Sequence, residues 1–296
     1  MRLSQLLRLL LLATLSLLGA GTLPAQQPTT LQAVTWNIEW FPGKSRNADP
    51  ATREAHAQLV QTELKKIDPD LFLAQEIADW QSFAELCAAV PGLRPVALSA
   101  FSNEETGEYW PQQLGIASKL PVEAAWSEPW KEGDPTPRRG FTVAALRLPQ
   151  SDRLLLVYNL HLKSNRSNSD EEAQLNFRTR NESIRQLLAH IHATETVLFR
   201  NRVAAVLIGG DFNTNHDGQF ADQVIPLLLD AGFHHTWANV PRNQRLTWRG
   251  SDRFEPTTFD HFFTKGLAKV KAQLLTVPDA TSDHWPVQIR FPLPQP

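Results

Sequence analysis

Cysteine is almost absent from this chain, and the absence limits both its stability and its chemistry. Cys87 is the single cysteine in 296 residues, so no intramolecular disulfide and no metal site built from several thiolates can form. It lies in a helix-like run, residues 80–90, among small and apolar neighbours, and nothing adjacent would lower its pKa. We therefore expect a buried, inert thiol and a fold stabilised by its hydrophobic core.

The apolar run near the start of the chain is too short to span a bilayer. Residues 9–18 are rich in leucine, follow Arg2 and Arg8, and lead into small residues ending at Pro24-Ala25. A membrane-spanning helix needs ~20 apolar residues. This pattern predicts a secretory signal peptide at residues 1–25, with a buried N-terminal helix as the alternative. We expect a secreted or periplasmic mature protein without a transmembrane segment.

An excess of positive charge is missing too. The chain has 29 Lys and Arg against 31 Asp and Glu, a formal charge of −2, which becomes −4 if Arg2 and Arg8 leave with residues 1–25. This balance argues against the broad basic surface of proteins that bind nucleic acid without sequence preference. It leaves room for a local basic groove.

Two familiar hydrolase motifs are also absent. The chain contains neither Gly-x-Ser-x-Gly nor His-Glu-x-x-His, which disfavours a serine hydrolase of the elbow type and a zinc protease. Ser282-Asp283-His284 are consecutive, so their side chains cannot form the relay of a catalytic triad.

Apolar runs of strand length alternate with helical patterns along the chain, without a low-complexity linker. Strands in direct succession, with helices between others, favour mixed sheets over parallel ones. Two packed sheets with outer helices accommodate them in one domain, residues 26–296. We expect strands at 31–36, 70–75, 113–118, 141–148, 154–160, 203–209, 257–263, 268–277 and 287–291, and helices at 52–67, 171–200 and 222–229.

Polar and charged residues follow several of the expected strands, where rigid scaffolds present reactive groups. One such residue alone is more often a turn, a helix cap or a surface pair. Six groups in one chain indicate a shared site. They are Asn37-Ile38-Glu39, Gln75-Glu76, Asn159-Leu160-His161, Gly210-Asp211-Phe212-Asn213, Asp260-His261 and Ser282-Asp283-His284.

The spacing within two of these groups is informative. Asn37 and Glu39 are two residues apart, as are Asp211 and Asn213, so in extended backbone each pair points to one side. Both pairs follow apolar runs, and burial of an unpaired carboxylate costs several kcal/mol. A bound cation or an ion pair would relieve that cost. Oxygen ligands without cysteine favour Mg²⁺, Mn²⁺ or Ca²⁺ over structural zinc.

In this order, the six groups resemble the endonuclease/exonuclease/phosphatase family. Gly210-Asp211-Phe212-Asn213 followed by Ser282-Asp283-His284 is the specific part, and the groups at Asn37 and Glu76 are weak on their own. The resemblance spans about residues 31–291. It implies a four-layer α/β/β/α sandwich, in which helices flank two packed mixed β-sheets and the site lies at one rim.

The resemblance also implies a metal site. Glu76 would be the principal ligand of Mg²⁺, with Mn²⁺ or Ca²⁺ as alternatives. Asn37, Glu39 and Asp283 would lie near the metal or the phosphate.

The catalytic roles follow from the same resemblance. Asp211 would orient or deprotonate the attacking water, and Asn213 would help to hold the water and the phosphate. His284, oriented by Asp260, would bond to the phosphoryl oxygens. His161 would contact the phosphate or assist the leaving group.

Basic and aromatic residues suggest the substrate. Arg139, Lys163 and Arg166 could bind flanking phosphates while Trp110 or Trp130 stacks on a base. Solvated charges and packing aromatics are the alternative interpretation, and tryptophan could also enter a lipid interface.

Three functions remain at this stage. The first hypothesis is a secreted, monomeric, metal-dependent phosphoesterase that cleaves phosphodiester bonds, acting on nucleic acid as a DNA endonuclease. The second is a phosphodiesterase or phosphatase for phospholipid head groups or small phosphate esters, which the charge of −4 mildly favours. The third is a non-catalytic descendant that binds a partner. The intact set of motif residues argues against the third.

Overall fold

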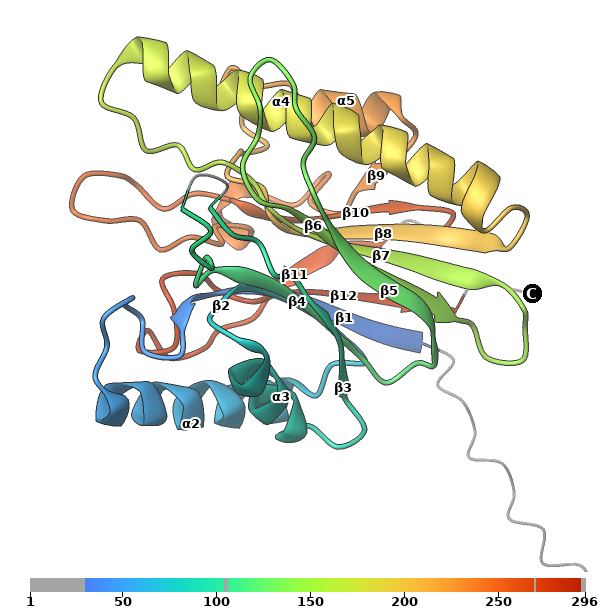
Figure 1. The fold of residues 1–296 in the computed structure, drawn as a ribbon, viewed down its shortest axis with the longest axis horizontal. Helices are drawn as coiled ribbons and strands as arrows, with labels where there is room; N and C mark the ends of the chain where they lie inside the picture. Colours follow the sequence, from blue (N-terminus) through green and yellow to red (C-terminus); the bar gives the residue numbers. More distant parts are fainter. Residues whose placement is uncertain (1–29, 104–105, 269, 294–296) are drawn as a thin grey trace, which may run out of the picture.

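Two six-stranded sheets pack face to face at the centre of the computed structural model, which describes residues 30–103, 106–268 and 270–293 (Figure 1). The expected signal peptide, residues 1–25, lies outside the described residues. Helices cover the outer face of each sheet, so the described chain has four layers. This arrangement confirms the expected α/β/β/α sandwich.

The first sheet has the strand order β11-β12-β1-β2-β4-β3. β1 and β2 run parallel, and the other neighbours are antiparallel. Its strands are β1 (Thr30–Phe41), β2 (Leu71–Ile77), β3 (Arg94–Leu98), β4 (Gln113–Ser118), β11 (Ala272–Leu274) and β12 (Val287–Pro292).

The second sheet has the order β5-β6-β7-β8-β10-β9. Its one parallel pair in the described chain is β7 with β8. Its strands are β5 (Val122–Pro129), β6 (Gly140–Arg147), β7 (Leu154–His161), β8 (Val203–Asp211), β9 (His234–His235) and β10 (Asp260–Lys265).

The helices divide between the two outer faces (Figure 1). α2 (Pro50–Ile67) and α3 (Trp80–Ala88) cover the first sheet, and α4 (Asp170–Ala193) and α5 (Val224–Asp230) cover the second. A short π-helix, Thr194–Leu198, extends α4, and a 3-10 turn, Arg242–Gln244, precedes β10. No helix of the described chain combines the length and the apolar character that crossing a membrane requires.

Three apolar clusters hold the four layers together. One lies between the sheets and includes Leu73, Leu207 and Phe262. Another joins the second sheet to α4 and α5, and a third joins the first sheet to α2 and α3. Cys87 is fully buried in the third cluster, and burial raises the pKa of its thiol to about 12. The expectation of an inert thiol is consistent with this position.

The sequence pattern missed three strands, β3, β5 and β9. β3 carries Pro95 and β5 ends at Pro129, and proline within a sheet is confined to edges, strand ends and bulges. All three lie at sheet edges, and β5 is half exposed along most of its length. Edge strands face one neighbour and water, so they lack the apolar run or strict alternation by which a strand is recognised.

A buried ion pair fastens α4 to the loop before α5. Arg180 and Asp222 have side chains that are essentially inaccessible to solvent and lie 2.6 Å apart. Asp222 also accepts a hydrogen bond from Thr214, and Arg180 donates to the carbonyl of Lys163. The pair therefore anchors the loop that follows β7.

Removal of one member of this pair should be costly. Arg180→Met leaves the Asp222 carboxylate buried without its cation, and we expect a loss of ~3–5 kcal/mol in the free energy of unfolding. Arg180→Met/Asp222→Asn removes both charges and should recover part of that loss. Urea denaturation followed by tryptophan fluorescence measures both effects.

The control is an exposed pair on the same helix. Arg185 lies 3.6 Å from Glu182 on the surface of α4, and Arg185→Met should change the free energy of unfolding by less than ~1 kcal/mol. Equal losses for Arg180→Met and Arg185→Met would contradict the role given to the buried pair.

Candidate active site

The polar groups at the strand ends meet at one rim of the sandwich. β1 and β2 are parallel, so Asn37 and Glu76 lie at the same end of the first sheet. β7 and β8 are also parallel, and His161 pairs in register with Asp211. β10 runs back along β8 from the same rim, with Asp260 opposite Asp211.

Two amides join the sheets directly behind this rim. Nε2 of Gln75 donates to Oδ1 of Asn159 (2.6 Å), and Nδ2 of Asn159 donates to the carbonyls of Ala74 and Gly115 (2.8 Å each). Gln75 precedes Glu76 in the first sheet, and Asn159 lies two residues before His161 in the second. The bridge therefore sets the spacing between groups that the two sheets contribute.

Asp211 lies at the centre of the cluster, buried at 2% exposure. Its Oδ2 accepts from Nδ2 of Asn37 (3.0 Å) and lies 3.5 Å from Nε2 of His161 and 3.9 Å from Nε2 of His284. Burial and the charge of Asp260 raise its pKa to about 7, against the opposing effect of His284. Asn37 and His284 therefore reach one carboxylate of the second sheet from segments that belong to the first.

Gly210 allows this close approach of strands. Its φ of +144° is a conformation that residues with a side chain rarely adopt, and a Cβ there would lie 2.1 Å from the carbonyl oxygen of Leu160. Only glycine fits at position 210, which lies against the backbone of β7 and directly precedes Asp211.

Asp260 orients His284. Oδ2 of Asp260 lies 2.7 Å from Nδ1 of His284, and both side chains are buried. Burial alone would lower the pKa of His284, but Asp260 and Asp211 raise it to about 10. Since Nδ1 is bound to Asp260, the protonated Nε2 faces Asp211 and the rim.

Arg139 determines the tautomer of His161. Nη1 of Arg139 lies 3.0 Å from Nδ1 of His161, and a guanidinium can only donate. Nδ1 is therefore the acceptor, and the proton of the neutral ring is on Nε2, toward Asp211. Burial, together with the charges of Arg139 and His284, lowers the pKa of His161 well below its usual value.

Backbone amides and side-chain donors together hold Glu76, Glu39 and Asp283 at the rim. Oε2 of Glu76 accepts from the N–H of Trp40 (2.9 Å), and its Oε1 lies 3.4 Å from Nδ2 of Asn37. Oε2 of Glu39 accepts from the N–H of Asp283 (3.0 Å) and pairs with Lys44. Oδ2 of Asp283 accepts from the indole of Trp248 (3.1 Å).

The expectation that Asn37 and Glu39 point to one side is wrong. Glu39 and Trp40 have φ values of +43° and +53°, so β1 is not extended there. The amide of Asn37 reaches Asp211, whereas the carboxylate of Glu39 reaches Asp283 and Lys44. A second pair also departs from extended backbone: Asn213 has φ +51°, and its amide donates to the carbonyl of Leu162 (3.2 Å).

Left-handed backbone is concentrated at this rim. Besides Glu39, Trp40 and Asn213, both Glu76 (φ +65°) and Arg139 (φ +68°) adopt it. Such conformations cost ~1–3 kcal/mol each and persist where the surroundings over-determine them, which is common at functional sites.

The donors present suit a divalent cation of the magnesium type. Five carboxylates gather here, and the nearby positive groups are His284, Arg139 and Lys44. Oxygen ligands supplied by one or two carboxylates are those that Mg²⁺ prefers. The five are Glu39, Glu76, Asp211, Asp260 and Asp283.

Two subsets of these groups could take the cation. Single atoms of Asp211, Asp260 and His284 lie within 4.8 Å of one another. The Asp260–His284 hydrogen bond accounts for much of that proximity, and a protonated imidazole is a poor ligand. The carboxylates of Glu76, Glu39 and Asp283 do not form so tight a group among the described residues, and Glu39 is paired with Lys44. In the described chain Glu76 bonds only to the N–H of Trp40 and to the amide of Asn37, so its carboxylate is the best candidate for the principal ligand.

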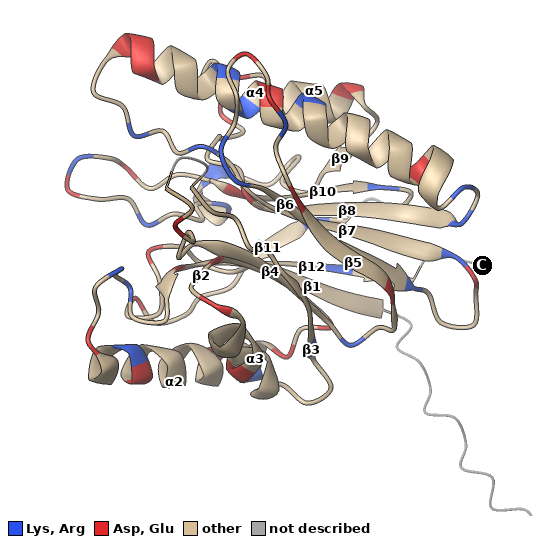
Figure 2. Cartoon of the chain, in the orientation of Figure 1, with Lys and Arg blue, Asp and Glu red and all other residues tan. Residues whose placement is uncertain are grey.

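The three expected substrate-binding residues are not equivalent. Arg139 contacts His161 within the cluster. Lys163 is half-buried nearby, and burial lowers its pKa. Arg166 is exposed, and among the described residues no hydrogen bond or ion pair places its side chain at the rim. Figure 2 shows basic segments in the β5–β6 and β7–α4 loops that flank the rim.

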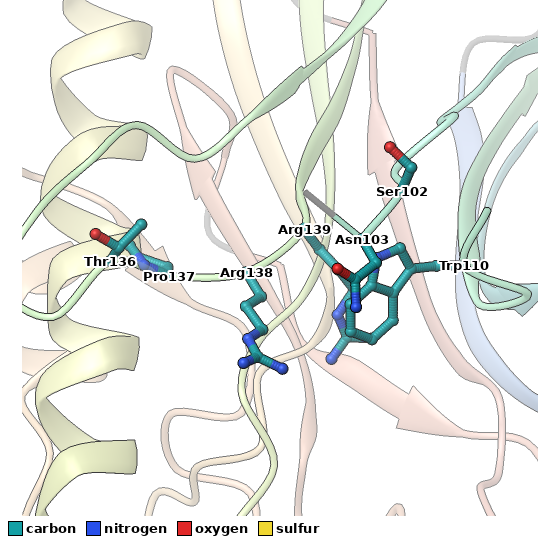
Figure 3. Close-up of a pocket in the computed structure, with 7 residues that line it drawn as sticks. All are labelled: Ser102, Asn103, Trp110, Thr136, Pro137, Arg138 and Arg139. Atoms are coloured by element: carbon teal, nitrogen blue, oxygen red, sulfur yellow. The ribbon is translucent and has the colours of Figure 1, made fainter. Parts of the chain in front are cut away.

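Beside Arg139 lies a hollow of about 280 Å³. Trp110, Arg138 and Arg139 line it together with Ser102, Asn103, Thr136 and Pro137 (Figure 3). Trp110 lies next to Arg139 in this view. Trp130, the other candidate for base stacking, is instead buried against Phe141 in the core.

Two residues of this region were not expected from the sequence. Trp248 holds Asp283, and His56 contacts the backbone of two site loops. A tryptophan between turns and a histidine within a helix carry no pattern that distinguishes them from packing residues.

Comparison with known proteins bears on the family and the fold. The sequence profile described as "Endonuclease/Exonuclease/phosphatase family" matches residues 34–284. No curated protein matches the chain in sequence.

Several solved structures have a similar fold. The human Nocturnin catalytic domain with bound sulfate has a TM-score of 0.65 at 15% identity, covering 90% of this chain and 95% of that one. Beta toxin from Staphylococcus aureus has 0.62 at 16% identity, covering 88% and 99%. Truncated Caenorhabditis elegans TDP2 has 0.58 at 16% identity, covering 89% and 97%. At these identities the likeness shows the fold alone.

The contacts of His161 predict its protonation state. Because burial and Arg139 disfavour the imidazolium, His161 should still be neutral, with its proton on Nε2, at the pH where an ordinary histidine titrates. Nitrogen-15 NMR of the histidine rings reports the tautomer directly. Arg139→Met should raise the pKa of His161. A midpoint near 6.5 in the unmodified protein would contradict the arrangement.

Proposed function

The chain belongs to the endonuclease/exonuclease/phosphatase family, and we propose that it is a divalent-metal-dependent phosphodiesterase. The observation that supports this activity best is the convergence of Asn37, Glu76, His161, Asp211 and His284, contributed by segments of both sheets, at one rim. Phosphoryl transfer needs little covalent chemistry from the protein, because positioning and charge neutralisation supply most of the catalysis. A buried cluster of acids and imidazoles suits that task.

Glu76 would hold the cation, with Glu39 and Asp283 beside it. A Mg²⁺ ion, or Mn²⁺ or Ca²⁺ in its place, would neutralise charge on the phosphate oxygens. Asn37 would contribute through its amide, which bonds to both Glu76 and Asp211.

The remaining groups would act on water and phosphate. Asp211 would accept the proton of the attacking water as its oxygen bonds to phosphorus and the ester P–O bond breaks. The Nε2–H of His284, held by Asp260, would donate to a phosphoryl oxygen. His161 presents Nε2–H on the other side of Asp211, where it would contact the phosphate or the leaving oxygen. Asn213 would support Asp211, to which its backbone N–H donates (2.9 Å).

Three substitutions test this assignment. Asp211→Asn, Glu76→Gln and His284→Ala should each lower turnover at least ~100-fold, because each removes a positioned base, a metal ligand or a phosphate donor. Initial rates with bis(p-nitrophenyl) phosphate and Mg²⁺ measure the effect, and circular dichroism checks the fold.

Exposed residues of the same types serve as controls. Asp230→Asn, Glu171→Gln and His192→Ala alter side chains on the outer helices, and should leave turnover within about twofold, since surface changes away from a site have small effects. Near-wild-type activity in two of the three site variants would defeat the assignment.

For the substrate, we propose DNA cleaved by an endonuclease. The hollow beside Arg139 supports this choice, because Trp110 offers a stacking surface and Arg138 a cation for a flanking phosphate. Nε1 of Trp110 is buried without a hydrogen-bond partner in the described part of the chain. A polar, planar group such as a base would supply an acceptor. Action outside the cytoplasm is part of the proposal and follows from the signal-peptide pattern of residues 1–25. We also propose that the protein acts as a monomer.

A lipid substrate remains the second candidate. Phe254 is 66% exposed in the loop between the 3-10 turn and β10, where it could meet an interface. Trp126 and Trp130 do not support this function, since one is half-buried and the other is in the core.

A substrate panel separates the candidates. Purified protein with Mg²⁺ should cleave plasmid and single-stranded DNA but not sphingomyelin, and EDTA should abolish cleavage. Trp110→Ala should raise KM for a single-stranded oligonucleotide about tenfold, since stacking contributes ~1–3 kcal/mol per base. Arg138→Ala should raise KM and weaken its dependence on salt, because a phosphate contact is lost. Trp80→Ala and Arg178→Ala, both exposed on outer helices, are the matched controls.

The other outcomes identify the alternatives. Cleavage of sphingomyelin alone would show that the substrate is a phospholipid and not DNA. Inertness toward every substrate, with or without metal, would favour a non-catalytic partner-binding protein.

A further inference from the structure

His56 lies on the buried face of α2, outside the cluster of acids described above. Its ring nitrogens both bond to backbone: the N–H of Gly43 donates to Nδ1 (2.7 Å), and Nε2 lies 2.7 Å from the carbonyl oxygen of Thr281. A carbonyl only accepts and an amide N–H only donates. The ring is therefore neutral, with its proton on Nε2, and both of its polar atoms are satisfied. Burial lowers the pKa of His56, in agreement with this state.

The two partners belong to the two loops that carry the proposed metal ligands. Gly43 follows the segment in which Glu39 binds the N–H of Asp283 and the N–H of Trp40 binds Glu76. Thr281 lies two residues before Asp283. One side chain thus ties both loops to a rigid helix of 18 residues.

These loops need such an anchor. Glu39, Trp40 and Lys44 all have positive φ, and Gly43 has φ +118° in a space where a Cβ would lie 2.5 Å from that of Ala48. Backbone of this kind relaxes unless surrounding contacts hold it. The rings of Phe41 and His56 pack at an interplanar angle of 60° with their centroids 5.6 Å apart, a contact that restricts rotation of the imidazole.

We propose that His56 is a positioning residue for the metal site, holding the Glu39 loop and the Asp283 loop in register beside Glu76, the principal ligand proposed for the divalent cation. The inference rests on the proposed metal-dependent function. It adds a residue from α2 that touches neither cation nor substrate.

Three substitutions separate the two hydrogen bonds. His56→Asn keeps an acceptor near Nδ1 and can retain the bond from Gly43. His56→Gln keeps a donor near Nε2 and can retain the bond to Thr281. His56→Ala loses both. Mn²⁺ binding, followed by electron paramagnetic resonance of the free ion, reads out the site without reference to turnover.

We expect His56→Ala to weaken Mn²⁺ binding about tenfold, in line with the loss of groups that orient metal ligands. The Asn and Gln variants should lie between Ala and wild type. His190→Ala is the matched control, because His190 bonds to Tyr158 and Glu128 on the opposite side of the fold. It should lower the free energy of unfolding in EDTA and leave Mn²⁺ affinity unchanged.

The proposal is overturned if His56→Ala, or the milder variants where Ala does not fold, binds Mn²⁺ as tightly as wild type while only stability falls. An equal loss of affinity in His190→Ala would also overturn it. Failure of the wild type itself to bind Mn²⁺ would overturn the proposed metal dependence together with this role. The failure of the metal dependence is distinguishable from the failure of the His56 role, because Mn²⁺ binding by the wild type is measured before any substitution is made.

Discussion

Asp211 and Asp260 face one another across β8 and β10 with almost no access to water. Two carboxylates in such surroundings are strongly destabilising unless positive charge lies close by. His284 supplies part of this positive charge, since its ring bonds to Asp260 and faces Asp211. Arg139 lies near enough to Asp211 and Glu76 for their charges to act on its pKa. The other carboxylates of the rim still leave an excess of negative charge, and a divalent cation is the simplest group to balance it.

The topology makes this concentration of charge attainable. Within the residues that the structure describes, each sheet has one parallel pair, β1 with β2 and β7 with β8, and both pairs end at the same rim. The bridge between Gln75 and Asn159 joins the sheets just behind it. Residues nearly 250 positions apart, such as Asn37 and Ser282, then come within hydrogen-bond distance. The apolar clusters supply stability, while the rim carries strained backbone that the rest of the fold holds in place.

Much of this could be predicted from the sequence, for identifiable reasons. Strands such as 113–118 and 154–160 have short, mainly apolar centres and are buried on both faces, so they are recognised directly. The acids and histidines of the site follow such strands, and their order matches a family. The edge strands β3 and β5 lack that pattern. The divergence of Asn37 and Glu39 depends on positive φ values, which no local feature of Glu39 or Trp40 signals. The ring nitrogens of His56 bond to backbone atoms of two loops outside α2, so these partners exist only in the folded chain.

The location of the cation is the most direct test of this account. Crystals soaked in Mn²⁺ and examined by anomalous scattering should show a peak bonded to Glu76, beside Glu39 and Asp283 and facing Asp211. A peak coordinated by Asp260 and His284 instead would contradict the ligand set, since His284 would have to be deprotonated and released from Asp260. The absence of any peak at the rim, in crystals with the ion in excess, would contradict the claim that this cluster of acids exists to bind a metal.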